Sequence, residues 1–107
     1  MANGKKRNGA HSGKTVLALM GKNISLIRGY GVHRIGVFGS YVNGRPRPRS
    51  DVDILVEFEP GRKTFDNYMD LLFFLEKLFR RKVDLVIAEA VKPDLRPGIF
   101  GSVVYAS

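Results

Sequence analysis

The chain is built around two short segments, Val37-Phe38-Gly39-Ser40 and, ten residues later, Asp51-Val52-Asp53-Ile54-Leu55-Val56. The first is an apolar run that ends in a Gly-Ser turn, and the second is rich in the residues that favour strands. Alternate residues of a strand point to the same side, so Asp51 and Asp53 present their carboxylates to one point. Two like charges repel there unless a cation lies between them, and Mg²⁺ is a hard ion that takes such oxygen ligands. The pattern predicts a magnesium-dependent nucleotide site.

The Gly-Ser turn has the properties of a phosphate-binding segment. Gly39 lets the backbone come close to a phosphate because it has no β-carbon. Ser40 offers a hydroxyl, and the N–H groups at a helix start can bind phosphate oxygens. The loop that follows carries Arg45, Arg47 and Arg49, any of which could reach a triphosphate or an acidic partner. A solvated loop is the alternative for these arginines, and we expect one of the three to matter.

Local patterns predict alternating helices and strands on both sides of these segments. The expected elements are a helix over 15–28, strands over 32–38 and 51–58, a helix from Asp66 as its cap to Arg81, a strand over 82–88, a short helix over 94–100 and a strand-like end at 103–105. Three strands alternating with helices predict a small α/β (α+β) fold with helices packed against the sheet. Residues 1–14 are interpreted as a basic disordered tail and 15–107 as one domain.

The predicted helix after Asp66 is unusually apolar. One face carries Tyr68, Leu71, Leu72, Leu75, Leu78 and Phe79, and an adjoining face carries Phe65, Met69, Phe73 and Phe74. We interpret both as a wide stripe that faces the core. The alternative is a surface for another subunit, which leaves a homo-oligomer open.

Composition narrows the class of protein. At 107 residues the chain is long enough for one domain with a modest core. It has no cysteine for a disulfide or a thiolate site, and no apolar run reaches the ~18–20 residues of a membrane span, so we expect a cytoplasmic protein without a membrane segment.

Charge is divided unevenly along the chain. Residues 1–50 hold ten Lys or Arg and no acid, whereas residues 51–107 hold eight Lys or Arg and ten acids. Such asymmetry suggests a polyanionic partner for the first half, and a nucleotide triphosphate, an acidic protein or nucleic acid would each suit it.

The two segments resemble a known family. Gly39-Ser40, the ten-residue spacer and Asp51-Val52-Asp53 are similar to the GS-x10-DxD signature of the minimal nucleotidyltransferases, small members of the DNA polymerase beta-like superfamily. Lys82-Val83-Asp84-Leu85-Val86 supplies a third acid on a later strand, and the order of elements from Thr15 to Val91 looks like that family. The resemblance implies the polymerase beta-like fold, a small mixed β-sheet with helices packed against it.

The resemblance also implies an activity. The chain would be a nucleotidyltransferase that moves AMP from ATP to a hydroxyl, with Asp51, Asp53 and Asp84 as ligands of a two-ion Mg²⁺ site. Asp84 would complete the ion on the acceptor side and help deprotonate the hydroxyl, while Gly39 and Ser40 bind the β- and γ-phosphates. The acceptor implied is a tyrosine of a partner HEPN toxin, so that the chain is the antitoxin of a toxin–antitoxin pair.

Two other functions compete with this one. A non-catalytic module of the same fold would neutralise its partner by binding alone, although three intact acids argue against it. A nucleic-acid-binding protein would use the basic tail and loop, and its binding would survive loss of Asp51 and Asp53. We do not favour nucleic acid as the partner.

Overall fold

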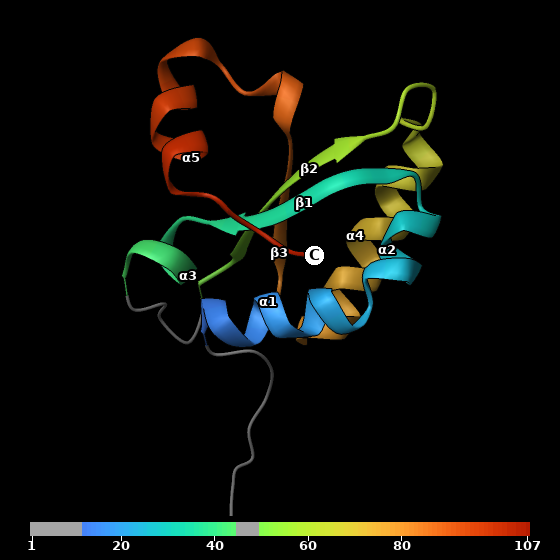
Figure 1. Ribbon diagram of the computed structural model, residues 1–107, viewed down its shortest axis with the longest axis horizontal. Coiled ribbons are helices and arrows are strands. Elements are labelled where there is room, and N and C mark those ends of the chain that lie inside the picture. The colour runs from blue at the N-terminus through green and yellow to red at the C-terminus, as the bar shows by residue number, and fades with distance from the viewer. Residues whose placement is uncertain (1–11, 45–49) are drawn as a thin grey trace, which may run out of the picture.

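The computed structural model describes residues 12–44 and 50–107. Helices and strands alternate through most of this part of the chain (Figure 1). The elements are α1 (Gly13–Lys22), α2 (Ile24–Gly29), β1 (Val32–Phe38), α3 (Ser40–Asn43), β2 (Val52–Phe58), α4 (Phe65–Phe79), β3 (Val83–Ile87), the short 3₁₀ helices η1 (Ala88–Ala90) and η2 (Pro93–Leu95), α5 (Arg96–Ser102) and β4 (Val104–Tyr105).

The strands form one mixed sheet in the order β3-β2-β1-β4. β1 pairs antiparallel with β2 and with β4, whereas β2 and β3 are parallel. A parallel neighbour requires a crossover, and α4 provides it between β2 and β3. The mixed sheet confirms the predicted fold class. The terminal strand-like segment is a fourth strand, and its close approach requires Gly36, since a β-carbon there would lie 2.7 Å from the carbonyl oxygen of Val104.

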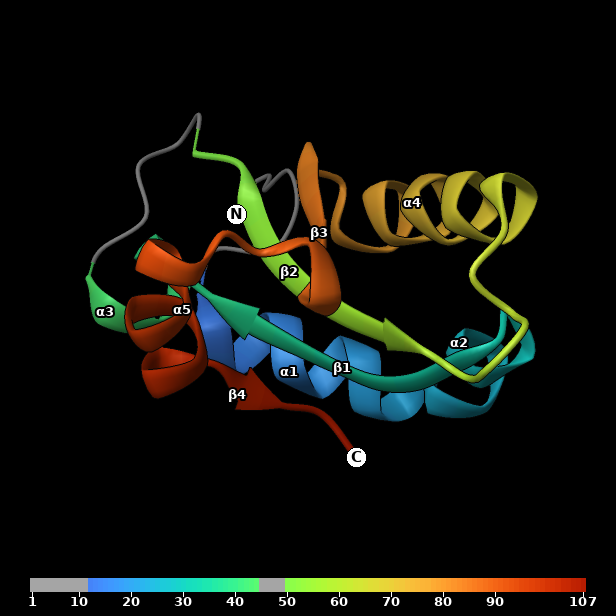
Figure 2. The same ribbon diagram turned by 90° about the horizontal axis from the view of Figure 1, so that it is seen from above.

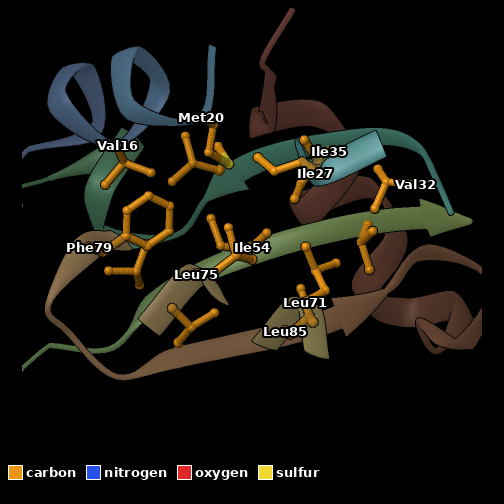
Figure 3. Close-up of a cluster of buried hydrophobic side chains, with 14 of the residues drawn as sticks. Val16, Met20, Ile27, Val32, Ile35, Ile54, Leu71, Leu75, Phe79 and Leu85 are labelled. Atoms are coloured by element: carbon orange, nitrogen blue, oxygen red, sulfur yellow. The ribbon is translucent and has the colours of Figure 1, made fainter. Parts of the chain in front are cut away.

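One face of the sheet packs against α1, α2 and α4. Alternation along the strands sends Ile35, Val37, Ile54 and their counterparts to this face, where helix side chains meet them (Figure 3). The fully buried members of the cluster are Val16, Met20, Ile27, Val37, Val52, Ile54, Val56, Leu71, Leu75 and Phe79. Burying each such side chain contributes roughly 1.5–3 kcal/mol, so this layer carries most of the stability of the fold.

The other face of the sheet is only partly covered. Phe38 and Leu55 form a smaller buried cluster with Ala88 and Val91, against which Ile99 and Phe100 of α5 pack. α3 and α5 both lie beside the end of β1 in Figures 1 and 2. Polar side chains at the start of β2 and β3 are therefore left at the open part of this face.

Several boundaries differ from the sequence prediction, three of them in the helices of the main core. The helix expected over 15–28 is two helices, because Asn23 leaves the helical conformation at φ −115°, ψ 19° and its side-chain amide donates to the carbonyl of Leu19 at 2.8 Å. The cap of α4 is Thr64, whose hydroxyl accepts from the N–H of Asn67 at 3.1 Å, and Asp66 lies within the first turn. Gly13 and Lys14, assigned to the tail, belong to α1, while residues 1–11 lie outside the described residues.

The apolar stripe of α4 is narrower than predicted. Leu71, Leu75 and Phe79 are fully buried, but Phe65 and Phe73 are 78% and 59% exposed. The interpretation of both α4 faces as core was wrong at these two positions. None of the helices in residues 12–44 and 50–107 has the length and apolar character of a membrane span.

Candidate active site

The three predicted carboxylates come together on the open part of the sheet. Asp53 and Asp84 are directly paired in register on the parallel strands β2 and β3. Asp51 lies two residues before Asp53, immediately ahead of β2. Asp53 shares its side of β2 with Leu55, which packs under α5, so the acids lie on the face opposite α4.

The signature turn lies beside the same carboxylates. Phe38, the last residue of β1, is paired with Asp53, so the chain enters Gly39 next to that side chain. Gly39 has φ +74° and ψ −144°, a conformation that side chains rarely adopt. A β-carbon built on Gly39 would also collide with the carboxylate of Asp53. Glycine is thus needed at this position for two reasons: it can adopt the positive φ angle, and it leaves room for the carboxylate of Asp53.

The turn continues directly into the short helix α3. Ser40 opens it half-buried, and the N–H of Val42 donates to the carbonyl of Gly39 at 3.0 Å. Tyr41 is 4% exposed and anchors α3 in the main core. A β-carbon at Gly13 would collide with the carbonyl oxygen of Tyr41, so the first residue of α1 packs closely beneath the turn.

The acids influence one another electrostatically. Burial raises the pKa of Asp53 from 3.8 to about 6, and the negative charges of Asp84 and then Asp51 add to the effect. Repulsion of this kind requires the three carboxylates to lie near one another. A bound cation would relieve it, so the site is prepared for positive charge.

The donor set suits a hard cation, although it is not closed around one. All three groups offer carboxylate oxygens, the ligands that Mg²⁺ prefers. Within residues 12–44 and 50–107, no three His, Asp or Glu side chains are gathered tightly enough to enclose a metal ion. Mg²⁺ ordinarily keeps waters and substrate phosphates in its shell, so an open set of acids beside the Gly39-Ser40 turn fits this ion.

The predicted loop arginines cannot be placed at the site. Arg45, Arg47 and Arg49 lie outside the described residues, and their role stays a prediction. Two α4 side chains for which the sequence analysis predicted no such contact bind the strand that carries Asp84. The hydroxyl of Tyr68 donates to the carbonyl of Leu85, and the carboxylate of Glu76 accepts from the N–H of Val83. No local pattern signals these contacts, because they join positions seven and seventeen residues apart in different elements.

Comparison of sequences identifies the family. A family model for the nucleotidyltransferase domain matches residues 23–105, which include the turn and all three acids. The protein adenylyltransferase MntA of Thermococcus cleftensis is 42% identical over 76 residues, covering 71% of this chain and 76% of that protein. These matches confirm the predicted relationship.

Solved structures agree with the sequence comparison. A structure assigned to the minimal nucleotidyltransferases has a TM-score of 0.75 at 34% identity, covering 87% of this chain and 94% of the other. A toxin–antitoxin structure with AMP-PNP has a TM-score of 0.61 at 28% identity, covering 78% and 68%. A tri-AMPylated Shewanella oneidensis HEPN toxin in complex with its MNT antitoxin has a TM-score of 0.60 at 23% identity, covering 84% and 70%, and that likeness shows the fold alone.

Proposed function

Because the chain belongs to the nucleotidyltransferase domain family, we propose that it is a protein adenylyltransferase that moves AMP from ATP to a hydroxyl of a partner protein. The observation that carries the proposal is the pairing of Asp53 with Asp84 beside the Gly39 turn. It brings an oxygen-rich cation site next to a segment that can approach phosphate closely.

The residues of the chain take separate roles in this reaction. Asp51 and Asp53 would hold Mg²⁺, with Asp84 completing the set on the acceptor side. The ion would supply positive charge against the triphosphate and make the acceptor hydroxyl more acidic. Gly39 and Ser40 receive the β- and γ-phosphates, and one of Arg45, Arg47 and Arg49 adds a charged contact.

The chemical step is a displacement at the α-phosphorus of ATP. The acceptor oxygen forms a bond to that phosphorus while the bond to the pyrophosphate oxygen breaks, and pyrophosphate leaves. The hydroxyl proton passes to a base at the site. We assign this role to Asp84, because its side chain is exposed and it lies on β3, the edge strand of the sheet. No cysteine or covalent enzyme intermediate is involved in this scheme.

The acceptor we propose is a tyrosine of a HEPN-domain toxin, for which this chain acts as the antitoxin. Two related structures support this choice: one is a toxin–antitoxin with AMP-PNP, and the other is a tri-AMPylated HEPN toxin in complex with an MNT antitoxin. A cytoplasmic location is part of the proposal, because ATP is the substrate.

The test uses ATP labelled at either the α- or the γ-phosphate, together with Mg²⁺ and a candidate HEPN-domain partner from the same genome. We expect the α-label, and not the γ-label, to appear on a tyrosine of the partner. Asp53→Asn should abolish labelling, whereas Asp70→Asn, the same change on the exposed side of α4, should not. Unlabelled partner that still binds this chain tightly would instead support neutralisation by binding alone.

A further inference from the structure

β3 lies at the edge of the sheet, so half of its backbone groups face away from any neighbouring strand. The N–H of Val52 donates to the carbonyl of Lys82, which shows that residue 82 faces β2. Backbone direction alternates along a strand, so Asp84 also faces β2 while residues 83 and 85 face outward. The outward groups on each side of Asp84 would have no strand partner.

Two side chains of α4 bind these outward groups. The N–H of Val83 donates to Oε2 of Glu76 at 3.0 Å, and the hydroxyl of Tyr68 donates to the carbonyl oxygen of Leu85 at 2.6 Å. Both hydrogen bonds are partly buried, which strengthens them relative to exposed ones. They flank Asp84, one on the residue before it and one on the residue after it.

These two hydrogen bonds affect the candidate site because they hold the part of β3 that carries Asp84. Asp84 is paired with Asp53, and the ladder to β2 restrains only the inner side of β3. The bonds from Glu76 and Tyr68 restrain the outer side at the same residues. We propose that Glu76 and Tyr68 are positioning residues, which fix the backbone around Asp84 and so hold its carboxylate opposite Asp53. This inference rests on the proposed role of Asp84 in the reaction.

The character of each side chain agrees with this role. Burial, and to a lesser degree the charge of Asp84, raise the pKa of Tyr68, so its hydroxyl keeps the proton that it donates. The carboxylate of Glu76 accepts from a backbone N–H, a hydrogen bond that an ionised acceptor makes stronger. Neither side chain lies on the face that holds the acids, since α4 packs on the opposite one.

The test compares conservative and disruptive changes at these two positions. Tyr68→Phe keeps the ring and removes only the hydroxyl, Glu76→Ala removes the acceptor, and Glu76→Gln keeps an oxygen that can accept from Val83. Phe73→Leu, on the exposed side of α4, is the control. Mn²⁺ affinity is measured by electron paramagnetic resonance without turnover, amide exchange is followed at residues 83–85, and AMP transfer is measured separately.

We expect Tyr68→Phe and Glu76→Ala to exchange faster at residues 83–85 and to bind Mn²⁺ about 10-fold more weakly. Transfer should fall by about 10- to 100-fold, the effect expected when a reacting group is displaced by about 1 Å. Glu76→Gln should restore most of the loss. If Glu76→Ala does not fold, Tyr68→Phe decides the question because its packing is unchanged.

An Asp84→Asn variant separates the two ways of failing. If Asp84→Asn loses Mn²⁺ affinity and transfer while Tyr68→Phe and Glu76→Ala behave like Phe73→Leu, the positioning role is overturned and the proposed function stands. If Asp84→Asn itself keeps full Mn²⁺ affinity and transfer, the role of Asp84 fails and the positioning role fails with it.

Discussion

The carboxylate of Asp53 fills the space that a β-carbon on residue 39 would need, so Gly39 and Asp53 are matched to each other across β1 and β2. The Gly-Ser turn and the acid pair are two parts of one signature, separated by ten residues in the sequence. Here the absence of a side chain in the first part makes room for the functional group of the second.

Replacing Gly39 with alanine should therefore harm both stability and activity. The backbone conformation at φ +74° costs roughly 1–3 kcal/mol for a residue with a side chain. The new β-carbon would also push Asp53 away from its position. We expect a lower urea midpoint and loss of AMP transfer. Gly98→Ala in α5 is the control, because a β-carbon there meets nothing within 4 Å, and it should be neutral or slightly stabilising. Wild-type activity in Gly39→Ala would show that the position of Asp53 does not depend on a glycine at residue 39.

The raised pKa of Asp53 predicts that Asp53→Asn stabilises the metal-free protein near neutral pH. The folded state holds the proton more tightly than the unfolded state, so the contribution of Asp53 to stability is complete below pH ~4 and is lost as pH rises through about 6. Allowing for solvent screening, the asparagine variant should gain on the order of 1–2 kcal/mol at pH ~7.5 and almost nothing at pH ~4. Urea unfolding across this range measures the difference. A constant difference would rule out the electrostatic cause.

Magnesium should reduce that difference. A cation bound among Asp51, Asp53 and Asp84 stabilises the folded wild type, by about 1.4 kcal/mol at ten times its dissociation constant. Asp53→Asn should gain much less, while Asp70→Asn should gain as much as the wild type because Asp70 lies on the exposed side of α4. Thermal unfolding with and without MgCl₂ measures this. Equal protection of all three proteins would place the ion elsewhere.

Two phenylalanines of α4 should differ sharply when truncated. Phe79 is fully buried against the sheet, so Phe79→Ala should destabilise the fold by about 3–5 kcal/mol. Phe73 is 59% exposed, and Phe73→Ala should change stability by only about 0.5 kcal/mol. Urea unfolding of both variants gives the comparison. Similar losses from the two would mean that Phe73 packs against something in solution.

The strands and the acid group were predictable because they depend on local patterns. Alternation placed Asp51 and Asp53 on one side of their strand, and the spacing from Gly39 made the turn recognisable. The third acid followed from the resemblance to a family. Val32–Phe38 is a strand at its predicted bounds, since Gly31 and Gly39 mark a turn at each end of it.

The pairing of elements could not be predicted in the same way. Whether Asp84 lies opposite Asp53 depends on the register of β2 and β3, which long-range packing sets. The strand-like pattern at Val104 likewise did not indicate which strand it would pair with, and in the structure this strand is β1. Asn23 interrupts a helical pattern that continues on both sides, because its side chain competes for a backbone carbonyl.

The parallel pairing of β2 with β3 also sets the order in which a growing chain can assemble its site. Residues 32–58 contain both strands of the antiparallel pair, so Gly39 and Asp53 can meet by closing one loop. Asp84 joins them only after α4 has been made and has crossed back over the sheet. A chain truncated before residue 83 therefore carries the turn and two carboxylates without the third. The complete acid group thus depends on two folding steps of different range, closure of the loop between β1 and β2 and docking of β3 after the α4 crossover.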